Sequence, residues 1–348
     1  MPNDRIEGKW LAAFVRTFQL SKVNPGDEVP IVSETQSRSL NVQLAELALL
    51  SIGAKPFHVV VPTQPQKMSI PIRSTGASDA LDGLTALAAT LKACPIFIDL
   101  TVEGLLHAPQ LPDLLAGGTR MLYVSDEHPE ALERLCSDER LKDKVQAGVT
   151  MMRGARTMRV SSEAGTDLTI DLKDARMGGG WGFADTPGKA DHWPGGLVAC
   201  YPQAGAVNGR IVFAPGDINL TFKRYFERPV TFRIEQDYAV AVEGEGVDGE
   251  LMRSYLAAWK DRNAYASSHV GWGMNSAARW EALAMYDKAD TNGTEQRAFA
   301  GNFLFSTGAN KHAGRFTLCH FDLPLRNCTI TLDNRVVVER GELIPALR

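Results

Sequence analysis

Apolar positions in the first 150 residues alternate between a helical spacing and short runs typical of buried strands. Residues 6–20 place Trp10, Phe14 and Phe18 on one face of a helix. Residues 37–50 indicate a second helix, which Gly53 ends. The same rhythm continues with strands at 28–32, 57–61, 95–100 and 121–124, helices at 77–92 and 129–136, and a short apolar segment at 111–115. Strands separated by helices predict parallel βαβ units, so we expect a doubly wound α/β domain over residues 1–154.

The pattern changes near residue 155, where short alternating segments begin. The alternation predicts one helix at 249–260 and strands at 157–161, 167–172, 210–213, 231–234, 238–242, 316–323, 328–332 and 335–338. Glycine-rich segments such as 177–182 and 243–246 are interpreted as turns rather than as phosphate-binding loops. We therefore expect a β-rich α+β domain over residues 155–348.

Composition and charge narrow the possible functions without choosing one. The chain has 348 residues, a formal net charge of −4 and no basic cluster, so we do not expect it to bind nucleic acid. No stretch is apolar for the length of a membrane span, and the N-terminus lacks the apolar core of a signal peptide. Five scattered cysteines are typical of reduced thiols, so we predict a cytoplasmic protein. The α/β half lacks both a Gly-x-Gly-x-x-Gly turn and a Walker A loop, which disfavours a nucleotide cofactor.

The strongest chemical signal is a histidine and an aspartate two residues apart in the predicted strand at 316–323. Residues i and i+2 project from the same face of a strand, so His320 and Asp322 can converge on one point. A third donor, His269, lies in the sequence SSHVGWG, whose small residues let the backbone pass close to a ligand. Two histidines and one carboxylate are the ligands of non-haem Fe(II) oxygenases, although zinc also accepts them. The alternative is a surface His-x-Asp pair and a core histidine.

Several short sequences in the second half resemble one group of proteins. They are GTDL at 165–168, PGG at 194–196, NG at 208–209, HVGWG at 269–273 and HFD at 320–322. Their order and spacing resemble the C-terminal domain of the thermophilic leucyl aminopeptidase family of metallopeptidases. They are more similar to the 2,5-dihydroxypyridine 5,6-dioxygenases, Fe(II) enzymes of nicotinate degradation on the same scaffold. The resemblance implies cleavage of a hydroxypyridine ring by O2 at a single Fe(II), giving N-formylmaleamate. We also expect a homo-oligomer.

Two departures from the peptidase pattern favour the dioxygenase. The peptidases place a metal-ligating glutamate after a Pro-x-Gly turn, where this chain has Leu197, and another of their glutamates corresponds to His269. A two-zinc site needs several carboxylates to offset four positive charges, whereas the donors that remain suit a single Fe(II). A metallo-aminopeptidase is the alternative enzyme. A non-catalytic ligand-binding protein is the alternative outside the enzymes.

The resemblance also suggests roles for three further residues. Ser306 falls where the peptidase scaffold brings another metal ligand, although a neutral hydroxyl is a weak ligand and a turn hydroxyl is the alternative. His107 follows the strand at 95–100, and ligands gather at the carboxyl ends of parallel strands. The resemblance suggests that it is the catalytic acid/base, and a solvated loop histidine is the alternative. His192 adjoins the turn at 194–196 and is expected to contact the substrate.

Overall fold

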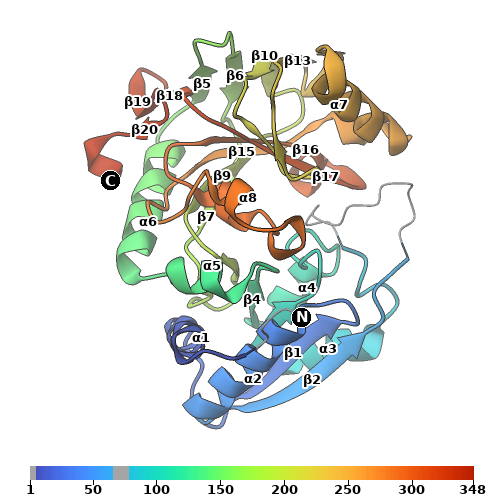
Figure 1. Cartoon of the computed structure of the whole chain (residues 1–348), viewed down its shortest axis with the longest axis vertical. Helices are drawn as coiled ribbons and strands as arrows, with labels where there is room; N and C mark the ends of the chain where they lie inside the picture. Colours follow the sequence, from blue (N-terminus) through green and yellow to red (C-terminus); the bar gives the residue numbers. More distant parts are fainter. Residues whose placement is uncertain (1–4, 66–77) are drawn as a thin grey trace.

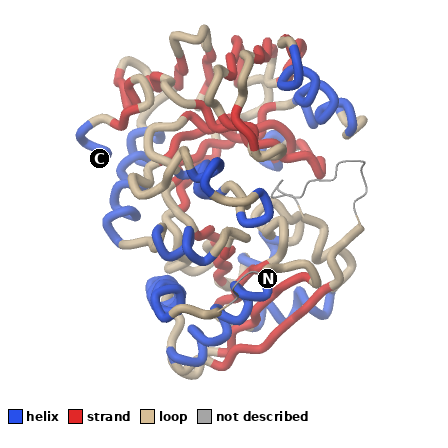
Figure 2. Tube along the Cα trace, viewed as in Figure 1, coloured by secondary structure: helices blue, strands red, loops and turns tan. Residues whose placement is uncertain are grey.

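A parallel sheet and several antiparallel sheets occupy different halves of the molecule (Figure 1). The computed structural model describes residues 5–65 and 78–348. Figure 2 shows the strands in red, with helices flanking the sheet of the lower half. Within the described residues, no helix has both the length and the apolar character needed to cross a membrane. All five cysteines are free thiols.

The lower half is a five-stranded sheet in the order β2-β1-β3-β4-β8, and every pair in it is parallel. Its strands are β1 (Glu28–Glu34), β2 (Lys55–Val61), β3 (Ile96–Leu100), β4 (Arg120–Val124) and β8 (Ala190–Trp193). Its helices are α1 (Gly8–Leu20), α2 (Ser39–Ile52), α3 (Thr85–Ala93), α4 (Leu111–Leu115) and α5 (Pro129–Arg134). Neighbouring strand residues face opposite sides: Ile98 packs with α1 and α2, whereas Phe97 packs with α3 and α4. Helices therefore cover both faces, as the βαβ pattern predicts.

Three details of this half differ from the prediction. The strand predicted as buried at 57–61 is the edge strand β2, where Val60 is 58% exposed. The helix α3 begins at Thr85 because residues 80–83 form turns, and residue 77 of the predicted helix lies outside the described residues. The sheet also takes a strand from beyond residue 154, because β8 pairs with β4. With the sequence ADHW, β8 shows too little apolar character to be detected as a buried strand.

The upper half contains an eight-stranded and a five-stranded antiparallel sheet. The first, in the order β14-β13-β10-β6-β5-β18-β19-β20, comprises β5 (Thr157–Ser161), β6 (Asp167–Asp171), β10 (Val207–Phe213), β13 (Val230–Glu235), β14 (Tyr238–Glu243), β18 (Thr329–Leu332), β19 (Arg335–Glu339) and β20 (Glu342–Leu343). The second, in the order β17-β16-β15-β9-β7, comprises β7 (Arg176–Gly180), β9 (Leu197–Tyr201), β15 (Ser267–Gly273), β16 (Phe303–Asn310) and β17 (Arg315–Leu325). The remaining elements include α6 (Glu139–Arg153), α7 (Gly246–Ala258), α8 (Ala282–Met285), α9 (Thr294–Ala298), β11 (Ile218–Asn219) and β12 (Arg224–Tyr225).

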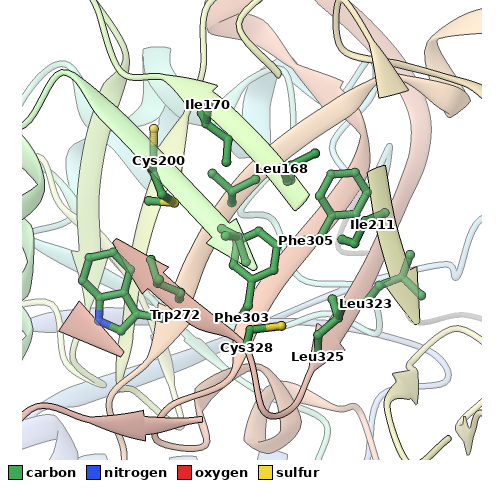
Figure 3. Close-up of a cluster of buried hydrophobic side chains, with 14 of the residues drawn as sticks. Leu168, Ile170, Cys200, Ile211, Trp272, Phe303, Phe305, Leu323, Leu325 and Cys328 are labelled. Atoms are coloured by element: carbon green, nitrogen blue, oxygen red, sulfur yellow. The ribbon is translucent and has the colours of Figure 1, made fainter. Parts of the chain in front are cut away.

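The two antiparallel sheets share the largest apolar cluster of the described residues (Figure 3). Leu168 and Ile211 from the eight-stranded sheet meet Phe305 and Leu323 from the five-stranded sheet. Cys319 belongs to the same cluster, so its side chain points away from its neighbour His320 as strand alternation predicts. This core leaves the opposite face of the five-stranded sheet free to carry polar chemistry.

The glycine-rich segment at 177–182, predicted as a turn, instead forms most of strand β7. The reason is packing against helix α6. A Cβ atom on Gly179 would lie 2.3 Å from Cγ1 of Val145, so a larger residue does not fit between strand and helix. The glycines here permit close approach rather than a change of direction.

A buried ion pair holds the beginnings of β15 and β17 together. Nη1 of Arg315 lies 2.8 Å from Oδ2 of Asp237, and both side chains are almost fully buried. Nη2 of Arg315 donates to the carbonyl oxygen of Ser267 at 2.6 Å, and Asp237 also accepts from the backbone N–H of Val207 at 2.8 Å. The pair therefore fixes the strand that carries His269, two residues after Ser267.

We expect Arg315→Met to lower the free energy of unfolding by about 3 kcal/mol, because it leaves Asp237 buried without its cation. The measurement is urea denaturation followed by fluorescence. Arg159→Met serves as the control, since Arg159 forms an exposed pair with Asp167 and should change stability by less than about 1 kcal/mol. Equal midpoints for the two variants would contradict this role of the buried pair.

Candidate metal centre

Neighbouring strands of the five-stranded sheet bring four predicted residues to one place. His269 lies on β15, Ser306 on β16, and His320 and Asp322 on β17. Strand β16 pairs with both β15 and β17, and Ser306 stands opposite Asp322 in the register. Because β17 is extended, its two polar side chains point the same way, and Nε2 of His320 lies 3.2 Å from Oδ1 of Asp322.

Three donor atoms form a triangle with sides of similar length. Nε2 of His269 lies 3.2 Å from Nε2 of His320 and 3.5 Å from Oδ1 of Asp322. Donors bound to one metal ion at about 2.1 Å and at right angles are about 3.0 Å apart. The triangle therefore has almost the dimensions of one face of a metal coordination sphere. Two imidazole nitrogens this close need a proton or a cation between them, because two lone pairs repel.

Burial and charge put two of these donors, His269 and Asp322, in the protonation states that a metal requires. Burial lowers the pKa of His269 to about 3, so the imidazole is neutral. Burial opposes ionisation of Asp322, but His320 and Arg297 outweigh that effect and hold its pKa well below the usual range. A neutral imidazole and an ionised carboxylate are the forms that bind divalent metals.

Ser306 lies between the histidine and the carboxylate. Its hydroxyl donates to Oδ1 of Asp322 and lies 3.2 Å from Nε2 of His269. The oxygen is thus close enough to be a fourth ligand, and the hydrogen bond to the carboxylate equally suits a supporting residue.

His107 approaches the triangle from the parallel half of the same chain. Its ring centroid is 4.1 Å from that of His320 and 6.1 Å from that of His269. Possible ligand atoms of these three histidines lie within 4.8 Å of one another, so they form a second possible ligand set. Burial lowers the pKa of His107 well below its ordinary value, which keeps the ring neutral.

The loop that carries His107 is held by a buried carboxylate at the end of β3. Asp99 accepts hydrogen bonds from the backbone N–H groups of Thr101 at 3.0 Å and Leu105 at 2.6 Å. Gly104 has a φ of +76°, and a Cβ there would lie 2.9 Å from the ring of Tyr123. Only glycine therefore fits at this point of the loop, and His107 follows three residues later.

His192 projects from β8 into the same pocket. Its Nδ1 lies 2.7 Å from the carbonyl oxygen of Pro194, and burial lowers its pKa. A carbonyl only accepts hydrogen bonds, so Nδ1 carries the proton and Nε2 is left as an acceptor.

The four histidines and Asp322 line a pocket of about 260 Å³ between the two halves. Its less polar wall is formed by Leu106, Gly178, Gly179, Gly180, Ala190, Leu197 and Ala199. Its polar wall adds Glu103, Tyr123, Asp191, Tyr201, Asn292, Thr294 and Arg297 to the histidines and Asp322. A flat aromatic ring of small size fits a space of this kind.

The sequence analysis missed Arg297, which lies on α9 and touches the candidate ligand set. Its Nε donates to Oδ2 of Asp322, the carboxylate oxygen that points away from the histidines. The surrounding sequence TEQRA has no motif, and the residue is 25 positions from its partner. Only the folded arrangement of α9 against β17 reveals it.

Comparison with known proteins identifies the family of this chain. A family profile described as 2,5-dihydroxypyridine 5,6-dioxygenase matches residues 9–345. The chain belongs to this family. A curated 2,5-dihydroxypyridine 5,6-dioxygenase of Pseudomonas putida KT2440 is 35% identical over 335 residues, which are 95% of each chain. The family resemblance expected from the short motifs is therefore confirmed.

Solved structures support the same assignment. The structure of 2,5-dihydroxypyridine dioxygenase from Pseudomonas putida KT2440 matches with a TM-score of 0.92 and 34% identity, covering 97% of this chain and 98% of that one. Wild-type AmpT from Thermus thermophilus matches with a TM-score of 0.65 and 14% identity, covering 97% of this chain and 99% of that one. The second likeness shows a shared fold.

We expect His269→Ala, His320→Ala and Asp322→Ala each to lose bound iron, because each removes one corner of the donor triangle. The loss of affinity should exceed the roughly 10–100-fold that removal of a supporting hydrogen bond costs a metal site. The measurement is metal analysis after anaerobic Fe(II) loading and desalting, with circular dichroism to confirm folding.

His58→Ala is the matched control, since His58 lies on the edge strand β2 beside Glu46. A folded triangle variant that keeps its iron would remove that residue from the ligand set. Ser306→Ala in the same series distinguishes a fourth ligand from a supporting hydroxyl.

Proposed function

We propose that this chain is an Fe(II)-dependent dioxygenase that cleaves the ring of 2,5-dihydroxypyridine with O2, giving N-formylmaleamate. The observation that carries the proposal is the triangle of His269, His320 and Asp322 in a pocket shaped for a small ring. Membership of the family supports the substrate. Both oxygen atoms of O2 enter the product, so the balance needs no organic cofactor.

We assign one divalent ion to His269, His320 and Asp322. Iron bound there supplies the one-electron chemistry with O2 that zinc lacks. The position where the aminopeptidase family has a glutamate is Leu197, which lines the pocket with an alkyl side chain. This absence of a carboxylate fits one ion better than two and disfavours the aminopeptidase alternative.

Arg297 and His192 are placed to orient the ring. Nε of Arg297 is engaged by Asp322, so the guanidinium is held at the pocket wall as a donor for a substrate oxygen. Nε2 of His192 is an acceptor and suits a ring hydroxyl or N–H. The glycines of β7 and the side chain of Leu197 add small and apolar groups to the pocket lining, which leaves room for the ring.

His107 is the proposed acid/base. A neutral imidazole in contact with the candidate ligand His320 can take the proton of a ring hydroxyl and later return it. Removing this proton raises the electron density of the ring, which favours its reaction with O2. Because His107 contacts His320 of its own chain, we propose that it acts within one subunit. The homo-oligomer, the cytoplasmic location and the division into residues 1–154 and 155–348 stay predictions.

The test is oxygen uptake by the Fe(II)-loaded protein with 2,5-dihydroxypyridine, other hydroxypyridines and a leucine amide. We expect uptake equal to the substrate consumed and formation of N-formylmaleamate, identified by mass spectrometry. EDTA should abolish the rate, and Fe(II) but not Zn(II) should restore it. Equal recovery with zinc, or hydrolysis of the amide without oxygen uptake, would overturn the proposal.

We expect His107→Ala to keep its iron and to lose roughly 10²–10⁴-fold in turnover, the usual contribution of a positioned base. The residual rate should rise with pH, because a substrate hydroxyl that ionises in solution no longer needs the base. Metal analysis and a pH series of oxygen uptake provide both readouts. Loss of iron in this variant would instead place His107 in the ligand set with His269 and His320.

A further inference from the structure

Glu127 follows strand β4 and is not among the described residues that line the pocket. The residue is only 3% exposed, and its carboxylate accepts four backbone hydrogen bonds. Oε2 accepts from the N–H of Asn292 at 2.9 Å. Oε1 accepts from the N–H groups of Gly293 and Thr294 at 2.9 Å each and from that of Glu295 at 3.5 Å. One buried side chain therefore holds four consecutive amides at the start of α9.

Other contacts attach the same segment to the parallel half. Oγ of Ser125 lies 2.8 Å from Oγ1 of Thr294. Arg134 on α5 binds both carboxylate oxygens of Glu295, at 2.7 and 2.9 Å. The beginning of α9 is thus held by residues of the parallel half, whereas the helix also contacts β15 and β17 of the five-stranded sheet.

The segment that Glu127 holds places Arg297 at the candidate metal centre. Arg297 follows Thr294 by three residues, which is slightly less than one helical turn. Its guanidinium contacts Oδ2 of Asp322, while Oδ1 of the same carboxylate faces both histidines. A shift of the backbone at 292–294 would therefore change the pairing between Arg297 and Asp322.

We infer that Glu127 is a positioning residue that acts through Arg297. By fixing the start of α9 it sets how strongly the guanidinium pairs with Asp322, and so how much negative charge this carboxylate offers to a cation. The same contact sets the position of the guanidinium toward the substrate. The substrate part rests on the proposed function, whereas the effect on cation binding does not.

The inference predicts that loosening Arg297 strengthens cation binding, because a nearby positive charge repels the ion. Arg297→Met should tighten Co(II) binding by at least about tenfold. Glu127→Gln should act in the same direction by a smaller factor, because its amide N–H₂ faces backbone donors and displaces the segment. In the Arg297→Met background, Glu127→Gln should have no further effect on Co(II) affinity.

The experiment is a double-mutant cycle on the full chain, with Co(II) affinity measured by its visible absorption in competition with a chelator. The KM and turnover of the Fe(II)-loaded variants are measured alongside it. Glu127→Gln should raise KM more than it lowers turnover, and this effect too should vanish in the Arg297→Met background. Glu127→Asp, which keeps the charge but shortens the reach, is the second variant should the glutamine form fold poorly. It should change both quantities in the same direction.

Asp217→Asn is the control for loss of a buried carboxylate, because Asp217 also accepts two backbone hydrogen bonds, from Ala214 and Arg326 at 2.7 Å each. It should leave Co(II) affinity unchanged. An effect of Glu127→Gln that is the same in both backgrounds, or that Asp217→Asn reproduces, would overturn the inference. A wild type that binds Co(II) but consumes no oxygen would refute only the proposed function, since the affinity cycle remains measurable.

Discussion

The buried negative charge of Asp322 is the constraint on which the site depends. A carboxylate this far from water is stable only with a charged partner and hydrogen bonds. The described residues supply the guanidinium of Arg297 on one oxygen and the hydroxyl of Ser306 on the other, which also lies beside two imidazoles. The two carboxylate oxygens therefore have different partners. One is occupied by a permanent cation of the protein, and the other is directed at the place where a metal ion fits.

The two halves of the molecule contribute different parts of the pocket. The antiparallel half supplies donors on rigid strands, whose spacing is set by backbone hydrogen bonds. The parallel half supplies loops at the carboxyl ends of its strands, and acidic residues there hold those loops. Asp99 binds the loop that ends at His107, Glu34 binds the same loop through the N–H of Val102 at 2.7 Å, and Glu127 binds the entrance of α9. These three carboxylates thus organise the pocket, and none of them lines it.

The sequence predicted the parts of the site that depend on local geometry. Side chains two residues apart in a strand lie on the same face, so the spacing alone predicted that His320 and Asp322 lie side by side. The position of His107 needed a family resemblance, because nothing local says which loop crosses between the halves. Arg297 and Glu127 gave no signal at all, since their roles come from contacts between segments far apart in the chain. Strand β7 was missed for a related reason. Gly179 is required there by packing against helix α6, and the periodicity of the sequence along β7 cannot reveal that contact.

The glycine wall of the pocket also limits how this enzyme can change over evolution. Gly179 is blocked by Val145 of α6, and a Cβ on Gly180 would lie 2.6 Å from Nε2 of His192. Gly178 is different, because a Cβ there meets nothing within 4 Å, and it lines the pocket as well. Of the three consecutive glycines, it alone can gain a side chain without disturbing the helix or the histidine. A substitution at Gly178 could therefore reshape the pocket for narrower or differently substituted rings. Substitutions at Gly179 and Gly180 would instead clash with Val145 and His192.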